Sequence, residues 1–206
     1  MDSLKESHII MVPFPKLNEL IFILEQLYEF ILDDHANLVS FYTLPEENSI
    51  EDIIGEHSGN VMGILAAGMA SAYINGGWFG TLSEITLDAG YWIIVDEPSV
   101  TLSGLGVTYD PHRVFDLHTG ANLVAYPNLS AADLSASIPD AVEPLFLAIL
   151  GSGVAAYNDE NYGWVGALSS FDSGSGYWMI VSEDLSFSYE QTDLARTEIK
   201  RYVETR

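Results

Sequence analysis

The sequence predicts a mainly β fold with short helices (α+β), built from two tandem β-rich modules with a helix near each terminus. The first observation is an internal repeat. Segments 77–83 and 90–95 (GWFGTLS and GYWIIV) return as 163–169 and 176–181 (GWVGALS and GYWMIV). All four tryptophans fall in this pattern, which is typical of a chain made of repeated structural units. The second observation is an abundance of β-branched and aromatic residues divided by glycines, which favours short strands joined by tight turns.

Residues 1–35 are predicted to form an N-terminal arm and an apolar helix. A strand over 8–12 ends at the prolines that follow it. A helix is predicted over 16–34, because apolar residues recur there at alternating spacings of three and four. The seam consists of Leu17, Leu20, Leu24, Leu27 and Ile31. Other faces of this helix are apolar too, so it needs cover from its own module or from a helix bundle between copies. Leu20, Leu24 and Leu27 are therefore interface candidates.

The first β-rich module is predicted over 36–99. It begins with a strand at 36–42. A short helix at 50–57 follows, because Ser49 and Asp52 have the spacing of a capping box. Later strands are expected at 61–73 (as a strand pair or one bent strand), 78–82 and 90–95. The unbroken apolar run of the last strand predicts burial on both of its faces.

A connector and the second β-rich module are predicted over 100–190. The connector contains strands at 100–103 and 114–117. The second module repeats the order of the first, with a strand at 121–126 and the segment 130–137 in place of the short helix. Segment 183–188 loosely resembles 97–102. The strand that follows the module is therefore predicted to be repeated as well.

Residues 191–206 are predicted to form a C-terminal basic helix. Four of the seven Lys and Arg residues lie there, including Arg196, Lys200 and Arg201. Two interpretations stay open. Cations near the end of a helix stabilise its negative dipole end. Alternatively, the segment docks on an acidic neighbour such as another copy of this chain, which makes these three residues interface candidates.

The bulk composition excludes several functions. A formal charge of −23 argues against sequence-independent binding of nucleic acid and against docking on anionic membranes. The chain contains no cysteine, so we expect no disulfide framework, thiolate metal site or cysteine nucleophile. The polar start predicts no secretion signal, and the apolar stretch 17–32 is too short and too charged to span a bilayer. We therefore expect no nucleic-acid partner and no membrane insertion.

Motifs for chemistry are sparse. The five histidines show none of the spacings of zinc enzymes. The densest group of potential ligands is Asp110, His112, Asp116 and His118, which we interpret as a polar connector turn rather than a metal site. The acidic loop 158–161 lacks the regular oxygen-ligand spacing of a calcium loop. We predict no catalytic residues, no cofactor and no bound metal.

The aromatic residues of the repeat are the remaining candidates for an interface or ligand site. They are Trp78, Tyr91, Trp92, Trp164, Tyr177 and Trp178. Successive side chains of a strand point to opposite faces, so adjacent Tyr and Trp residues cannot both face the core. One residue of each pair is predicted to be covered by the other module, by a terminal helix or by a partner. Stacking of exposed rings on sugars is the alternative.

The repeated pattern resembles a β-rich module found in virion structural proteins of marine phages, notably cyanophages, and in stalk and anchoring regions of marine bacterial surface proteins. The residues that carry the resemblance are Asn-Leu-Val, then Gly-Trp-x-Gly-x-Leu-Ser, then Gly-Tyr-Trp-x-Ile-Val, and both copies match over about residues 36–190. The resemblance implies that the modules serve as spacers, decorations or adhesive units. Without a secretion signal, it favours assembly in the host cytoplasm and a place in the virion.

The combined prediction is a non-enzymatic structural or accessory protein of a marine phage virion, in the capsid, tail or fibre. Its predicted partners are other virion proteins and itself, as a homo-oligomer. One alternative is an adhesion module that binds a host-surface glycan through an exposed aromatic platform. A glycan-active hydrolase is a weaker alternative, because an active site need not be duplicated in both halves of a chain.

Overall fold

The computed structural model describes residues 8–11, 22–96, 100–108 and 113–190, and over these ranges the fold is mainly β, as predicted. The strand pairs are antiparallel throughout, which suits the short connections between them. The predicted C-terminal basic helix and the first part of the predicted helix over 16–34 lie outside the described residues.

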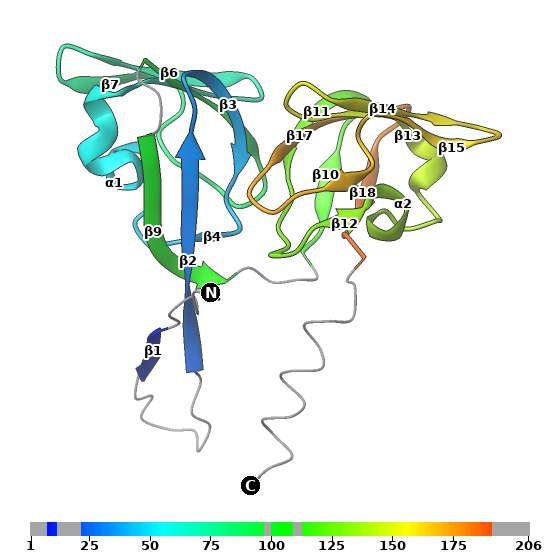
Figure 1. Ribbon diagram of the computed structural model, residues 1–206, viewed down its shortest axis with the longest axis horizontal. Coiled ribbons are helices and arrows are strands. Elements are labelled where there is room, and N and C mark those ends of the chain that lie inside the picture. Colours follow the sequence, from blue (N-terminus) through cyan, green and yellow to red (C-terminus); the bar gives the residue numbers. More distant parts are fainter. Residues whose placement is uncertain (1–7, 12–21, 97–99, 109–112, 191–206) are drawn as a thin grey trace, which may run out of the picture.

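The first half of the chain forms two sheets that share one hydrophobic core (Figure 1). A five-stranded sheet has the order β3-β8-β5-β6-β7, and a four-stranded sheet has the order β1-β2-β9-β4. Their strands are β1 (His8–Met11), β2 (Phe22–Leu32), β3 (His35–Ser40), β4 (Thr43–Leu44), β5 (Val61–Ala66), β6 (Met69–Ile74), β7 (Gly77–Gly80), β8 (Gly90–Val95) and β9 (Val100–Thr108). The segment predicted at 61–73 is thus a strand pair.

The second half of the chain forms a five-stranded sheet of matching order, β11-β17-β13-β14-β15, over a second core. Two small sheets, β10-β18 and β12-β16, lie beneath it (Figure 1). The strands are β10 (Phe115–Leu117), β11 (Gly120–Ala125), β12 (Ala132–Asp133), β13 (Phe146–Leu150), β14 (Ala155–Asp159), β15 (Gly163–Gly166), β16 (Ser170–Phe171), β17 (Gly176–Val181) and β18 (Leu185–Phe187). The pair β10-β18 corresponds to β2-β9, so the strand after the repeat does recur, as predicted.

Short helices pack against each core. In the first half α1 (Ile50–Ile54) continues into the 3-10 helix η1 (Gly55–Gly59), and Ser49 Oγ accepts the backbone N–H of Asp52 at 3.1 Å, which confirms the predicted cap. The second half has α2 (Leu134–Ser137) and the 3-10 helix η2 (Glu143–Leu145). Buried isoleucines of α1 and Leu134 of α2 fasten these helices to their cores.

The helix predicted over 16–34 is wrong where the chain is described, because residues 22–32 form strand β2. Tyr28, Phe30 and Leu32 are buried, whereas Glu29 and Ile31 are exposed, so the burial has a period of two. The leucine spacing fits a helix, but the apolar residues of 22–32 also fit the alternation of a strand. Pairing with the long strand β9 supplies the backbone hydrogen bonds that a helix would have supplied internally.

A second correction concerns strand β8, which was predicted to be buried on both faces. Tyr91, Ile93 and Val95 are buried in the core, but Trp92 and Ile94 on the opposite face are only partly covered. Strand β17 shows the same burial pattern. The continuous apolar run therefore reflects one core face and one open apolar face.

The two halves meet in reciprocal contacts, so an approximate two-fold axis relates them. Val39 pairs with Ser175, and its counterpart Val124 pairs with Ala89. The N–H of Ser40 donates to the carbonyl of Gly174 at 2.9 Å, and the N–H of Ala125 donates to the carbonyl of Asp88 at 2.9 Å. The two five-stranded sheets consequently lie side by side along one side of the molecule, with both cores beneath them (Figure 1).

This junction explains why each Gly-Tyr-Trp segment begins with a glycine. A Cβ atom on Gly90 would lie 2.9 Å from Leu123 Cδ1, and one on Gly176 would lie 2.7 Å from the carbonyl oxygen of Val39. The second of these sites would also place its Cβ 3.1 Å from the Cα of Gly90. Two glycines are thus required where the halves approach each other across the two-fold axis.

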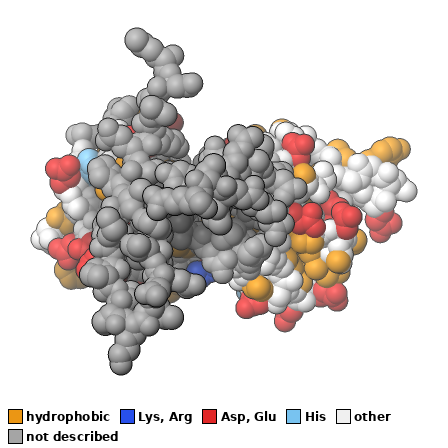
Figure 2. Space-filling view, turned by 90° about the horizontal axis from the view of Figure 1, so that it is seen from below, with side chains coloured by type: hydrophobic (Ala, Val, Ile, Leu, Met, Phe, Trp, Pro, Cys, Tyr) orange, Lys and Arg blue, Asp and Glu red, His pale blue; other side chains and the backbone are white. Residues whose placement is uncertain are grey.

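Charged side chains are prominent on the side of the molecule opposite the two five-stranded sheets. Viewed from below, Asp and Glu side chains stand out on both halves (Figure 2). Exposed acidic residues also lie on α1 (Glu51 and Asp52) and in β10 (Asp116), which are beneath the sheets (Figure 1).

Candidate interaction surface

The tryptophan of each Gly-Trp-x-Gly segment faces its own core. Trp78 packs against the first core and its Nε1 donates to Ser58 Oγ at 3.4 Å. Trp164 packs against the second core and its Nε1 donates to Glu143 Oε1 at 2.6 Å. In both halves the indole links the 3-10 helix, η1 or η2, to the edge strand of the five-stranded sheet, which is a structural role.

The tyrosine of each Gly-Tyr-Trp segment is also a core residue. The hydroxyl of Tyr91 accepts the backbone N–H of Thr86 at 2.7 Å, and the hydroxyl of Tyr177 accepts that of Asp172 at 2.7 Å. Burial raises the pKa of both phenols above their usual range. Each tyrosine therefore holds the loop that leads into its own strand.

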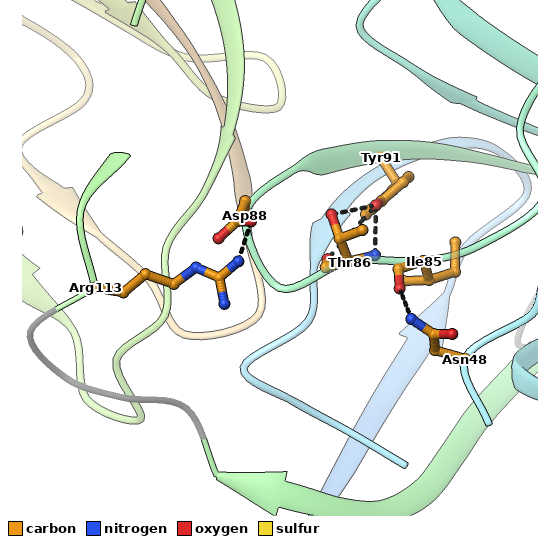
Figure 3. Close-up of polar contacts among 6 residues, drawn as sticks. All are labelled: Asn48, Ile85, Thr86, Asp88, Tyr91 and Arg113. Carbon is orange, nitrogen blue, oxygen red and sulfur yellow. Dashed lines mark hydrogen bonds and ion pairs between the residues drawn. The ribbon is translucent and has the colours of Figure 1, made fainter. Parts of the chain in front are cut away.

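Figure 3 shows how this loop is held in the first half. Tyr91 points toward Thr86, and Asn48 Nδ2 donates to the carbonyl of Ile85 at 2.9 Å. On the other side, Arg113 forms an ion pair with Asp88 and ties the start of the second half to the first. These hydrogen bonds and the ion pair thus hold the loop in place.

The second glycine of each Gly-Trp-x-Gly segment is fixed by backbone geometry. Gly80 and Gly166 have φ values of 156° and 153°, and a Cβ atom would lie 2.1 Å and 2.2 Å from the carbonyl oxygens of Ala70 and Ala155. Those carbonyls each accept two backbone N–H groups from the residues after the glycine. This part of the repeated motif therefore serves the fold rather than a ligand.

Trp92 and Trp178 differ from the other aromatic residues of the repeat, because they lie on the side of each sheet that faces away from the core. In the first sheet, Trp92 stands between Leu38 and Leu65 in directly paired positions. The register places the remaining residues of this side in the same layer. They include Ala36, Gly63, Ala70, Ala72, Ile74, Phe79 and Ile94.

The second sheet repeats this arrangement. Trp178 stands between Leu123 and Leu150 in directly paired positions. The remaining residues of its outward side include Ala121, Ala148, Ala155, Tyr157, Asp159, Val165 and Ile180. We call the outward sides of the two five-stranded sheets, taken together, the outer face.

The outer face is apolar and partly open to solvent. Phe79 is 62% exposed, Tyr157 is 52% exposed and Leu65 is 41% exposed. A β-bulge in the middle strand of each sheet leaves one further apolar side chain exposed, Met62 in β5 and Leu147 in β13. Contiguous exposed apolar surface of this kind is typical of an interaction site.

Charge is nearly lacking from the outer face. Within its ten described strands, the outward-facing positions carry a single charged residue, Asp159, at the far margin. Its carboxylate accepts the backbone N–H groups of Asn161 and Tyr162 at 2.9 Å and 3.1 Å, so it serves the hairpin turn. The chain as a whole has a formal charge of −23, so the outer face carries far fewer charged residues than the composition of the chain would suggest.

Leu38 and Leu123 make the outer face continuous across the two halves. Both are buried, and they lie at the junction over the glycines of the opposite half, as the close approaches at Gly90 and Gly176 show. Trp92 and Trp178 flank them on either side.

Comparisons with models of known protein families, with curated proteins and with solved structures find no match. The outer face must therefore be interpreted from its own geometry.

The other predicted interface residues are not brought to the outer face. Leu27 is partly buried in β2, on the other sheet of the first half. Leu24 lies on β2 without a described side chain, and Leu20, Arg196, Lys200 and Arg201 lie outside the described residues. The helix expected around Leu24 and Leu27 is wrong, because their segment is a strand, and their role at an interface stays a prediction.

Two residues of the polar connector, Asp116 and His118, lie in the described part of the chain. Asp116, His118 and Asp184 line a shallow hollow, and no group of three or more potential ligands there is arranged to hold an ion. Thr119 donates its N–H and hydroxyl to Asp184 at 2.7 and 2.8 Å, and these hydrogen bonds lower the pKa of that carboxyl. Asp110 and His112 lie outside the described residues.

None of the helices in the described ranges is long and apolar enough to cross a bilayer. The sequence interpretation missed most of the outer face. It singled out the two tryptophans but not Leu65, Phe79, Leu150 or Tyr157. Apolar residues on both alternating positions of 90–95 and 176–181 were the available signal, and that signal was interpreted as complete burial.

Proposed function

We propose that this chain is a non-enzymatic structural protein that works by docking its outer face on another protein. The observation that carries the proposal is the extent of this apolar, almost uncharged surface on a strongly acidic chain. Burial of such a surface is the main favourable contribution in protein association. The repeated residues that are not on the outer face hold turns, caps and the junction, which suits an architectural module.

We further propose that the two halves are tandem copies of one module and that the protein is a virion component of the marine phage type. The resemblance of the repeat to virion modules supports this placement, in the capsid, tail or fibre. The partners would be other virion proteins, met during assembly in the host cytoplasm. Mass spectrometry of purified particles tests the placement, and absence of peptides of this chain from the particles would contradict it.

Glycan adhesion remains the second candidate, since Trp92 and Trp178 are partly exposed side chains with rings that sugars stack on. Sugar sites combine a ring with polar groups that bind the hydroxyls. The outward neighbours paired with these tryptophans are leucines, so protein docking is the better supported of the two.

The docking proposal is tested with paired variants. Leu65→Asp with Leu150→Asp places a carboxylate on each half of the outer face without touching either core. The matched control is Ile31→Asp with Val114→Asp, because these residues are 68% and 57% exposed and lie off the outer face. Each chain is expressed with the other structural proteins of its particle and assayed for incorporation.

We expect the control to be incorporated and the outer-face variant to be excluded while remaining folded. Equal incorporation of both variants would contradict docking through the outer face. A glycan array on the same proteins then separates the adhesion alternative, which predicts sugar binding that the outer-face variant loses.

A further inference from the structure

We propose that the outer face pairs with the outer face of a second copy of this chain, giving a two-fold symmetric dimer. This inference rests on the proposed function, since it names the partner that the same surface takes. The resulting contact is two apolar sheet layers packed face to face, as in a β-sandwich, at a spacing of about 10 Å.

The first argument is symmetry. The reciprocal contacts Val39–Ser175 and Val124–Ala89 give the chain an approximate two-fold axis that passes between the sheets. The outer face therefore presents like residues in like positions on both sides of its centre, as with Trp92 and Trp178. A two-fold dimer needs a surface that is complementary to itself. A second copy can cover both halves of this one at once, with each half meeting an equivalent layer.

The second argument is area. Each sheet is five strands wide, and its strands are 4 to 6 residues long. At about 4.8 Å per strand and about 3.3 Å per residue, one sheet presents roughly 400 Å². The two sheets together present roughly 800 Å², which is about what each partner contributes to a stable interface of standard size.

The third argument is the placement of charge. Two chains of formal charge −23 repel each other, so any self-association must keep their carboxylates apart. The outer face has its one acidic residue, Asp159, at the far margin, and acidic side chains are prominent on the opposite side (Figure 2). Face-to-face pairing points those sides away from each other. Repulsion across that separation is weakened by salt, since the screening length is about 8 Å at physiological ionic strength.

The test is the mass of the full chain in solution, measured by sedimentation velocity over a range of concentrations. We expect a species of twice the chain mass of 22.6 kDa. The Leu65→Asp/Leu150→Asp variant is expected to sediment as a monomer, because pairing would bury its four carboxylates in one apolar layer. The Ile31→Asp/Val114→Asp control adds the same charge elsewhere and is expected to remain a dimer. Circular dichroism confirms that each variant is folded.

Salt provides a second readout with a definite sign. Salt screens the repulsion between the two acidic chains and leaves the apolar contact in place. The dissociation constant of the dimer is therefore expected to be lower in about 0.5 M than in about 0.02 M sodium chloride. Pairing through ion pairs, such as docking of the basic C-terminal segment, has the opposite sign.

A wild-type monomer at every concentration and salt level overturns the dimer. So does a dimer that both pairs of substitutions leave intact, or one that salt weakens. These failures are distinguishable from failure of the proposed function. If the wild-type chain is a monomer and Leu65→Asp/Leu150→Asp still prevents incorporation into particles, the outer face docks on a different protein. If the wild-type chain is a monomer and the variant is incorporated normally, the outer face is not a docking surface.

Discussion

Replacing Gly176 with alanine should loosen the junction between the two halves of the chain. The new Cβ would lie 2.7 Å from the carbonyl oxygen of Val39, 3.1 Å from the Cα of Gly90 and 3.1 Å from Leu38 Cδ1. The first two of these atoms are backbone, so a side-chain rotation cannot relieve the overlap. Either strand β17 or strand β3 must move, and the hydrogen bond between Ser40 N–H and the Gly174 carbonyl lies beside this contact.

The size of the effect follows from the cost of inserting one carbon into a packed site. Overpacking of this kind costs about 1–3 kcal/mol. For a chain of 206 residues, a loss of 1 kcal/mol lowers the melting temperature by about 2–4 °C, so the expected decrease is about 2–12 °C. Gly176→Ala is expected to act by separating the halves rather than by disturbing either core.

Urea unfolding followed by circular dichroism and tryptophan fluorescence measures this effect. The matched control is Gly59→Ala, because a Cβ on Gly59 meets nothing within 4 Å. That control is expected to leave stability unchanged or to raise it by about 0.4–1 kcal/mol through the unfolded chain. If Gly176→Ala is as stable as Gly59→Ala, the junction described above is wrong.

Three further predictions concern buried polar groups. Ser40→Ala should lower the free energy of unfolding by about 1–3 kcal/mol, measured in urea, because Ser40 Oγ donates to the Ser175 carbonyl at 2.8 Å and accepts the Tyr126 N–H at 3.1 Å. Asn122→Ala should cost a similar amount, and unchanged stability would contradict the clamp in which its side chain accepts the His118 N–H at 3.1 Å and donates to the His118 carbonyl at 2.8 Å. The raised pKa of Tyr91 predicts stability that is fully present below the unfolded value near pH 10 and is lost as pH rises through the folded pKa. Ultraviolet absorbance measures phenolate formation, and the difference between the wild type and Tyr91→Phe isolates the titration of Tyr91. A difference curve centred near pH 10 in the folded protein would contradict the raised pKa.

Local patterns in the sequence were sufficient for features that depend on neighbouring residues. The Ser49 cap, the strand character of 61–73 and the strands at 77–80 and 163–166 follow from spacing, glycine positions and β propensity. Whether 61–73 forms a strand pair or one bent strand was left open by the sequence, and the structure shows the pair. The segment 22–32 was misassigned because its apolar residues fit both a helical and a strand pattern. The partner strand β9 lies about 70 residues further along the chain and decides between them.

The sequence identified the repeated Tyr-Trp pair, but only the tertiary structure shows which of its two residues faces the core. The sequence by itself identified the repeated residues and ruled out a regular strand in which Tyr91 and Trp92 both face the core. It could not say which one is buried, because strand alternation leaves the choice of face open. The tertiary structure turned Tyr91 inward, where its hydroxyl meets Thr86, and left Trp92 on the outer face.

The sequence determined a mainly β chain with an internal repeat and a strongly acidic composition, because strand propensity, glycine placement and charge are properties of residues and their near neighbours. The tertiary structure decided where those residues lie relative to each other. It set Gly90 against Gly176 at the junction, and it joined two open sheet sides into one apolar surface. A surface assembled from strands that are distant in sequence exists only once their pairing is fixed, and so the outer face became visible only in the folded chain.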